Sequence, residues 1–217
     1  MTRVIRFSLA IANIVFAFFQ VHKSAVVLLI PKSHKLSDNV INLAAYFLLT
    51  TIAVITMLPE IKTHLYGFKK DDLNMALSFS ITGLVCASFF TLVLKLVGFP
   101  SNNIRGMFST VSVINGLIFA PIYEEVICRL VIQSWLSRIH NILAIVITAL
   151  VFCLLHFVNK ENISIGNVLP SFAAYLVLGV VCGISFWKQE NVIVTILIHV
   201  FWNAFVILSK LVFCFVV

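Results

Sequence analysis

Charged residues are scarce in this sequence. Asp, Glu, Lys and Arg make up 11% of the 217 residues, against about 25% in an ordinary soluble domain, while 61% of the residues are hydrophobic. So few charges could not cover the apolar surface of a soluble domain of this size. A lipid bilayer is the solvent in which the composition is reasonable, so the sequence predicts an integral membrane protein.

Glycine and proline are also few, at 8 and 5 residues, and no segment alternates apolar and polar residues over the length of a barrel strand. Such alternation is the pattern of a transmembrane β-barrel, whereas long apolar runs are typical of helices. We therefore expect an all-α fold, a polytopic bundle of transmembrane helices. No repeat, linker or low-complexity tract divides the sequence, so residues 1–217 are expected to form a single membrane domain.

Apolar segments that approach the roughly 20 residues of a membrane span occur seven times. We expect about seven spans, or eight if one segment contains a re-entrant turn. Pro121 falls in the middle of the fourth segment and is expected to kink or split it. A half-helix that begins there would carry Glu124 and Glu125 in its first turn, where the helix dipole favours negative charge. The seven segments span approximately residues 6–30, 40–58, 73–99, 107–136, 142–158, 168–187 and 192–217.

Several common catalytic motifs are missing. The sequence has no Gly-rich phosphate loop, no G-x-S-x-G and no H-E-x-x-H, and its five cysteines form no C-x-x-C pair. The net charge is +7, but most Lys and Arg lie between the apolar segments, where they can face anionic lipid headgroups. No basic stripe with interleaved aromatic residues predicts nucleic-acid binding. Membrane lipids are therefore expected partners, and nucleic acid is not.

Two adjacent acidic residues, Glu124 and Glu125, lie inside an apolar segment, whereas the other six fall in connecting segments. A charge at mid-bilayer costs about 2.5–3.5 kcal/mol on insertion scales, so both must face a protein interior or a water-filled cavity. Arg129 follows Glu125 by four residues, which allows the two to pair on one helix face. A buried pair that only locks helices together would explain Glu125 and Arg129. Glu124 points about 100° away and stays unexplained.

Two histidines and an asparagine lie inside later segments. His156 is near the end of the fifth segment, while His199 and Asn203 are four residues apart on one face of the seventh. A single buried histidine is usually a hydrogen-bonded core residue. Together with Glu124, however, these residues would supply a base for water, and nitrogen ligands or donors that hold a divalent metal, a water or an oxyanion. This inventory favours hydrolysis over redox chemistry or group transfer.

The same residues, taken in order, resemble the motifs of the CPBP family of intramembrane proteases. That family includes the CAAX prenyl endopeptidases and the Abi-type and bacteriocin-immunity proteins of bacteria. The sequence reads Glu-Glu-x-x-x-Arg at 124–129, Phe-x-x-x-His at 152–156 and His-x-x-x-Asn at 199–203. The resemblance covers about residues 118–204, which would be the motif-bearing core of the domain.

Three further features bear on this resemblance. Gly179 and Gly183 form a small-residue face that allows close helix packing, similar to the glycine-containing helix of the family. Cys128 and Leu130 stand where an aromatic residue and a glycine are more common in the family.

The resemblance implies a membrane protease, an endopeptidase that hydrolyses a peptide bond with a water activated by Glu124. Glu125 and Arg129 would orient the site. The implied catalytic residues are Glu124, Glu125, Arg129, His156, His199 and Asn203. The candidate ligands of a divalent metal such as zinc, in a metalloprotease-like site, are Glu124, His156, His199 and Asn203.

One glutamate can hardly be both a zinc ligand and the free base, so Glu124 is interpreted as the base, with a zinc site as the alternative. The implied substrate is a peptide or a membrane protein. The implied location is a bacterial cell membrane, with several spans. The sequence does not indicate an oligomeric state.

Three other functions are compatible with these residues. A non-catalytic bacteriocin-immunity or binding protein would need the fold but not Glu124. A proton-coupled transporter also keeps Glu, Arg and His within the membrane. A bis-histidine haem protein would use His156 and His199.

Overall fold

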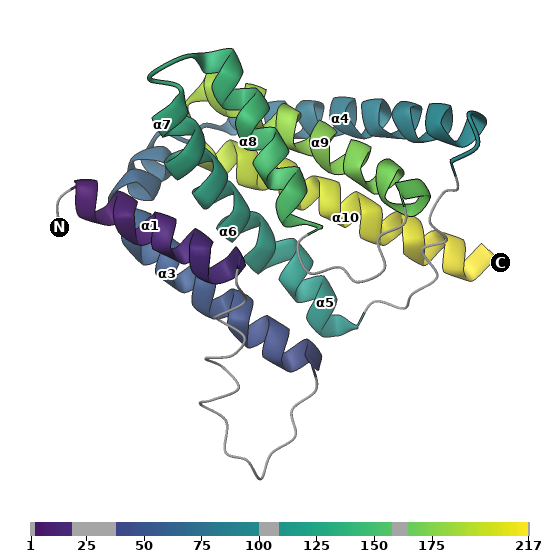
Figure 1. Ribbon diagram of the computed structural model, residues 1–217, viewed down its shortest axis with the longest axis horizontal. Helices are drawn as coiled ribbons and strands as arrows, with labels where there is room; N and C mark the ends of the chain where they lie inside the picture. The colour runs from purple at the N-terminus through teal and green to yellow at the C-terminus, as the bar shows by residue number, and fades with distance from the viewer. Residues whose placement is uncertain (1–2, 19–37, 100–108, 158–164, 217) are drawn as a thin grey trace, which may run out of the picture.

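Every secondary-structure element in the described part of the chain is a helix, which confirms the all-α fold (Figure 1). The computed structural model describes residues 3–18, 38–99, 109–157 and 165–216. Its helices are α1 (Arg3–Phe18), α3 (Asp38–Tyr66), α4 (Lys70–Leu96), a composite helix over residues 110–136, α8 (Asn141–Leu155), α9 (Ile165–Gln189) and α10 (Val192–Val216).

Five of the described helices are long and apolar enough to cross a membrane. Two more, α1 with 16 residues and α8 with 15, are shorter. Most of them begin and end near the bounds of predicted apolar segments, and the second half of the first segment lies outside the described residues. The predicted end of the second segment at residue 58 is wrong, because α3 continues through Pro59 to Tyr66. The five long stretches are Val40–Tyr66, Lys70–Leu96, Thr110–Leu136, Val168–Gln189 and Val192–Ser209.

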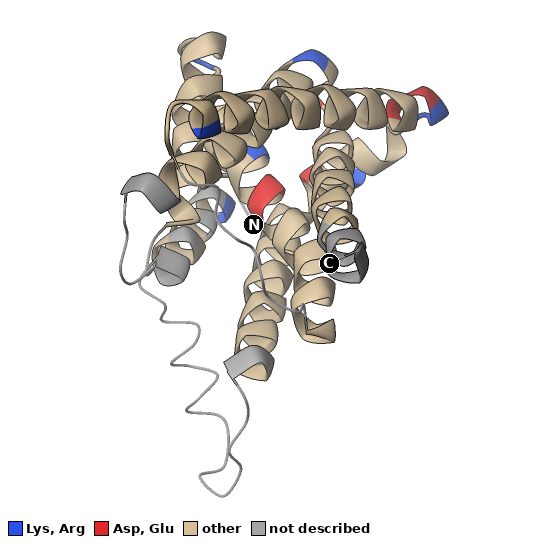
Figure 2. Cartoon of the chain, turned by 90° about the vertical axis from the view of Figure 1, so that its right-hand side faces the viewer, with Lys and Arg blue, Asp and Glu red and all other residues tan. Residues whose placement is uncertain are grey.

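Large apolar side chains cover much of the outer surface. On α4, for example, Val85 is 64% exposed and Phe89 is 61% exposed. Figure 2 shows long stretches of helix that carry no charged residue. A water-soluble protein rarely exposes contiguous apolar surface on this scale, whereas lipid chains solvate it without cost. The structure therefore agrees with a multi-pass integral membrane protein.

The helix that carries the two glutamates continues through Pro121. Its backbone at Phe119 and Ala120 is right-handed helical, so the prediction that Pro121 splits the segment is wrong. For the same reason Glu124 and Glu125 do not occupy the first turn of a new helix. The composite helix consists of α5 (Thr110–Ile114), the π-helical segment η1 (Asn115–Phe119), α6 (Ala120–Glu125), the π-helical segment η2 (Val126–Gln133) and α7 (Ser134–Leu136).

The π-helical turn before Pro121 explains how the helix tolerates this residue. Proline has no N–H and leaves a carbonyl of the preceding turn without its helical donor. The Ala120 N–H donates to the Asn115 carbonyl five residues earlier. In the same register the residue at position 121 would donate to the Gly116 carbonyl. Because Pro121 has no N–H, the Gly116 carbonyl lacks this backbone donor. The Asn203 side chain of α10 donates to that carbonyl through Nδ2, with an N···O distance of 2.7 Å. A neighbouring helix therefore replaces the hydrogen bond that proline removes.

Helices α8 and α9 approach each other at backbone distance. A Cβ atom added to Gly179 would lie 3.0 Å from Ala149 Cα, and one added to Gly183 would lie 3.0 Å from Ile145 Cγ2. A methyl group at Gly179 would require the α8 backbone to shift, whereas one at Gly183 would displace the Ile145 side chain. The predicted small-residue face is confirmed, and it brings α9 close to the helix that ends at His156.

Candidate active site

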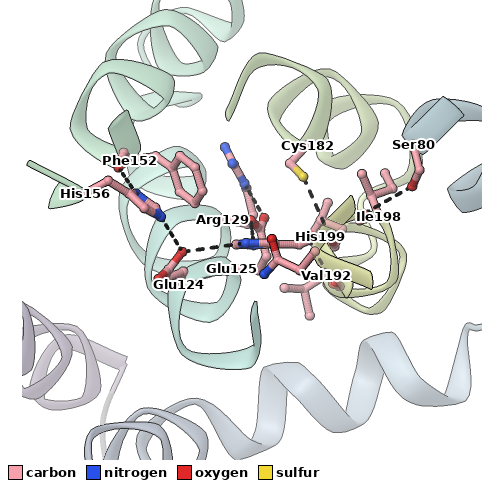
Figure 3. A network of polar contacts seen from close by, with 12 residues as sticks. Ser80, Glu124, Glu125, Arg129, Phe152, His156, Cys182, Val192, Ile198 and His199 are labelled. Carbon is pink, nitrogen blue, oxygen red and sulfur yellow. Dashed lines mark hydrogen bonds and ion pairs between the residues drawn. The ribbon is translucent and has the colours of Figure 1, made fainter. Parts of the chain in front are cut away.

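The imidazoles of His156 and His199 both face one carboxylate oxygen of Glu124 (Figure 3). Glu124 lies on α6, His156 follows the last residue of α8, and His199 lies on α10. The His156 Nε2 atom is 3.7 Å from Glu124 Oε2, and the His199 Nε2 atom is 3.8 Å from the same oxygen. The structure thus brings together three residues that the sequence only suggested as a group.

The other nitrogen of each imidazole is hydrogen-bonded away from Glu124. His156 Nδ1 lies 2.9 Å from the Phe152 carbonyl oxygen, and His199 Nδ1 lies 3.1 Å from Glu125 Oε1. A carbonyl and an ionised carboxylate only accept hydrogen bonds, so each Nδ1 atom carries a proton and donates it. In the neutral form, both imidazoles therefore direct an Nε2 lone pair at Glu124.

The Oε2 atom of Glu124 is buried and has no hydrogen-bond partner among the described residues. An unsatisfied buried acceptor costs about 1–3 kcal/mol, and the facing lone pairs of two imidazoles do not satisfy it. The separations of 3.7 and 3.8 Å are too long for direct hydrogen bonds and suit a water molecule between the groups. The side chains of Glu124 and His156 keep 14% and 20% exposure, so small molecules reach the site from their side.

Two imidazoles and a carboxylate have the chemistry of zinc ligands. Tetrahedral zinc with ligands at about 2.0–2.2 Å places ligand atoms roughly 3.3–3.6 Å apart. The separations from Glu124 Oε2 are wider, at 3.7 and 3.8 Å. Within the described residues, no group of three or more His, Cys, Asp and Glu side chains has the arrangement of a metal site. The three side chains as placed therefore stand slightly farther apart than the ligands of a closed tetrahedral zinc site.

The fourth candidate ligand, Asn203, makes a different contact. It lies one turn after His199 on α10, as the sequence predicts, but its Nδ2 atom donates to the Gly116 carbonyl on the helix that carries Glu124. This bond holds α10 against that helix. Asn203 therefore fixes the position from which His199 reaches the site.

A chain of buried polar groups lies behind the three converging residues. Arg129 Nε donates to Glu125 Oε2 at 2.8 Å, which confirms the predicted pair, and Arg129 Nη1 donates to Gln133 Oε1 at 3.0 Å. Gln133 Nε2 donates in turn to the Gly183 carbonyl of α9 at 2.8 Å. Glu125, Arg129 and Gln133 are fully buried. Because Glu125 also accepts from His199, this chain ties the orientation of that imidazole to α9.

Aromatic rings hold the two imidazoles from the sides. The centroid of the Phe152 ring lies 4.8 Å from that of His156 and 5.5 Å from that of His199. Tyr175 of α9 stacks on His156 with a centroid distance of 3.9 Å. Sequence reasoning missed Tyr175 and Gln133. The spacing of Gln133, four residues after Arg129 in an apolar segment, was a signal that could have found it.

Comparison with known proteins identifies the same region. Residues 106–205 match the family model of type II CAAX prenyl endopeptidase Rce1-like proteins, and this range contains all of the converging residues. Searches of the curated proteins and of the solved structures found no match. The family model and the order of the three motifs agree with each other. Over its segment 106–205 the chain is therefore similar to the CAAX prenyl endopeptidase family of membrane proteins.

Proposed function

We propose that this protein is an intramembrane endopeptidase in which Glu124 takes a proton from a water molecule that attacks a peptide carbonyl. One observation carries the proposal. Glu124 Oε2 is buried without a partner, and two imidazoles that are each oriented by a second hydrogen bond face it. A glutamate with a purely structural role would use both of its oxygens, as Glu125 does.

The proposed reaction consumes one water. As the water oxygen bonds to the carbonyl carbon, one proton passes to Glu124 Oε2 and the carbonyl π electrons move to oxygen. His156 Nε2 accepts a hydrogen bond from the second hydrogen of the water and so orients it. When the tetrahedral intermediate collapses, the C–N bond breaks and Glu124 returns its proton to the leaving amine. The products are a carboxylic acid and an amine, which ionise to a carboxylate and an ammonium group, and Glu124 is again ionised.

The remaining residues of the site would stabilise the oxyanion and hold the imidazole of His199 in place. His199 that has taken a proton from solvent at Nε2 before the attack would offer an N–H donor to the oxyanion of the intermediate. The Glu125 carboxylate, which accepts from His199 Nδ1 at 3.1 Å, would stabilise the imidazolium, as the acidic residue does in a Ser–His–Asp triad. Arg129 holds Glu125 in place for this role.

Substitution of Glu124 by glutamine tests the proposal, because the amide keeps the shape and loses the base. We expect cleavage to fall at least about 100-fold, the lower end of general acid–base contributions. Since the substrate is unidentified, the readout is a proteomic comparison of peptide termini in membranes that carry wild-type protein, Glu124→Gln or Asp71→Asn. Asp71 is an exposed acidic residue at the start of α4 and serves as the matched control.

New termini that appear with the wild type and with Asp71→Asn, but not with Glu124→Gln, would support the proposal. The same termini in all three samples, with all three proteins folded, would contradict it. A biological phenotype that survives Glu124→Gln intact would indicate a binding or immunity role instead. Ion flux in liposomes without any cleavage would indicate a transporter.

A further inference from the structure

A cavity of about 570 Å³ lies between α1, α3, the α7–α8 turn and the α9–α10 turn. None of Glu124, His156 and His199 lines it. Figure 1 shows the start of α1 and helix α7 at the same side of the molecule. The volume falls in the range of about 300–1,000 Å³ that is typical of small-molecule sites. The cavity is therefore large enough for a ligand of its own.

The lining of the cavity is apolar in one part and charged in another. Met57, Leu130, Val131 and Phe186 line it and belong to one buried hydrophobic cluster. The rest of the lining includes charged and polar side chains from the ends of the helices. These are Arg6, Glu60, His64, Arg138, Asn141 and Glu190. A ligand that fills this space is itself amphipathic, with an apolar part against the cluster and a polar head among the charges.

Two arginines that line the cavity have N–H donors without an acceptor among the described residues. Arg6 Nη1 pairs with Glu60 Oε2 at 3.1 Å, but Arg6 Nε is buried without a hydrogen-bond partner in the described part of the chain. Arg138 is exposed, and its side chain makes no hydrogen bond or ion pair with another described residue. Arginine donors of this kind recognise phosphate oxygens.

One anionic group in the cavity is also unpaired. Glu190 is exposed in the turn between α9 and α10, and its carboxylate makes no ion pair with a described residue. Its backbone has a φ of 49°, a left-handed conformation that sets the direction of the turn. A head that carries a phosphate and an ammonium group would pair with Arg138 and Glu190 together. A purely anionic head would leave Glu190 unpaired.

Two tryptophans place the cavity at the membrane surface. Trp135 and Trp187 both line it and are 49% and 46% exposed. Tryptophan is enriched at the level of lipid headgroups, where its ring meets apolar chains and its N–H meets water. With its amide turned to satisfy both polar atoms, Asn141 accepts a hydrogen bond from Trp187 Nε1 at 3.1 Å and fixes that indole. A lipid headgroup is thus at the right depth to enter.

We propose that this cavity binds a membrane phospholipid with a zwitterionic headgroup, of the phosphatidylethanolamine type. The phosphodiester would contact Arg138 and the partly exposed Arg6 side chain, and the ammonium group would contact Glu190. The first carbons of the lipid chains would lie on the apolar cluster. The proposal concerns lipid binding alone and does not depend on proteolytic activity.

The test is lipid retention by the purified full-length protein, measured by native mass spectrometry. The protein is incubated with vesicles that contain equal amounts of phosphatidylethanolamine, phosphatidylglycerol and phosphatidylcholine. We expect the wild type to retain phosphatidylethanolamine, and Arg138→Gln to lower that retention about 5- to 10-fold. Glu190→Gln should remove the preference over phosphatidylglycerol while phospholipid still binds. Lys62→Gln, an exposed cation on α3 outside the cavity, is the matched control and should behave as the wild type.

Two outcomes would overturn the proposal directly. One is equal retention by Arg138→Gln and Lys62→Gln, and the other is retention of diacylglycerol, which has no phosphate, as strongly as of phosphatidylethanolamine. Soluble phosphoethanolamine is tested in parallel by thermal unfolding. Stabilisation by this compound equal to that by the lipid would assign the cavity to a soluble ligand. Recovery of a bound peptide in place of lipid would assign it to the substrate.

Discussion

Glu124 and Glu125 are adjacent, yet their surroundings differ in almost every respect. Glu125 is fully buried and uses both oxygens, one for Arg129 and one for His199. Glu124 keeps some exposure and has one buried oxygen without a partner. A helix turns about 100° per residue, so neighbours in sequence face different elements. Identical side chains thereby receive different roles, Glu125 in support and Glu124 in the proposed chemistry.

Loss of Arg129 should destabilise the protein strongly. Arg129→Met would leave the buried Glu125 carboxylate without its ion-pair partner, and removal of one member of a buried ion pair costs about 3–5 kcal/mol. Denaturant unfolding in detergent micelles measures the change. The control is Lys62→Met, which removes an exposed cation and should have little effect. Equal unfolding midpoints for the two variants would show that the buried pair contributes no stability.

Most residues of the candidate site could be predicted from the sequence, because ionisable side chains inside apolar segments carry a high insertion free energy and are therefore rare. Gln133 escaped notice because a neutral amide costs less to bury than a charge. Tyr175 could not be distinguished, since aromatic residues are frequent in this sequence, with 20 Phe, 4 Tyr and 3 Trp. The contact of Asn203 with the Gly116 carbonyl depends on how two helices pack, which spacing along one helix does not indicate.

Among the elements, the composite helix shows how a proline can sit beside a functional residue without breaking the helix. The π-helical turn shifts the carbonyl that loses its donor to Gly116, where the amide of Asn203 reaches it. The ends of most helices could be predicted to within a few residues from charged residues, Gly and Pro. The π-helical register could not, because it depends on a side chain 87 residues away in the sequence.

A double-mutant cycle tests this compensation. In the wild type, Asn203→Ala should cost about 1–2 kcal/mol, because a buried carbonyl loses its donor. In a Pro121→Ala background the restored N–H can donate to the Gly116 carbonyl, so the same Asn203→Ala substitution should cost clearly less. Denaturant unfolding of the four proteins gives the coupling energy. A coupling energy of zero would mean that Asn203 does not compensate for the proline.

Packing of α8 against α9 gives a second prediction at this scale. Gly179→Ala places a methyl group 3.0 Å from the Ala149 backbone, which cannot move aside as a flexible side chain could. Overpacking of this kind costs about 1–3 kcal/mol, and the unfolding midpoint should fall. The matched control is Gly116→Ala in the composite helix, where an added Cβ meets nothing within 4 Å. A Gly179→Ala protein as stable as Gly116→Ala would show that α8 and α9 can separate freely.

For the whole molecule, the bilayer accounts for the distribution of side chains. Apolar residues are exposed along the long helices, while the fully buried charged side chains of the described part, Glu125 and Arg129, belong to the network of the site. Composition alone predicted a helical membrane bundle. It could not predict which helices are neighbours, because helices that are apolar on every face give no periodic signal of a core side. The glycine spacing of α9 indicated a close helix contact, but it did not indicate that α8 is the partner.

The lipid-facing surface of α4 offers a test at this scale. Val85 is 64% exposed near the middle of the helix, and Val85→Lys should disfavour membrane insertion by about 2.5–3.5 kcal/mol. Leu96→Lys, at the 77% exposed last residue of the same helix, is the matched control, because its ammonium group can reach the headgroups. The measurement is the fraction of protein that resists alkaline extraction from membranes. Equal fractions for the two variants would mean that this face of α4 does not contact lipid chains.

The contact between Gly179 and Ala149 contains no rotatable side chain. Glycine and alanine lose no rotamer entropy when they are buried, so no thermal population of other rotamers can alter the spacing of α8 and α9 at this point. His156 follows α8, and Tyr175, which stacks on it, lies one turn before Gly179 on α9. Warming therefore loosens the long lipid-facing side chains first. The distance across which His156 faces Glu124 should be among the last dimensions of the protein to expand.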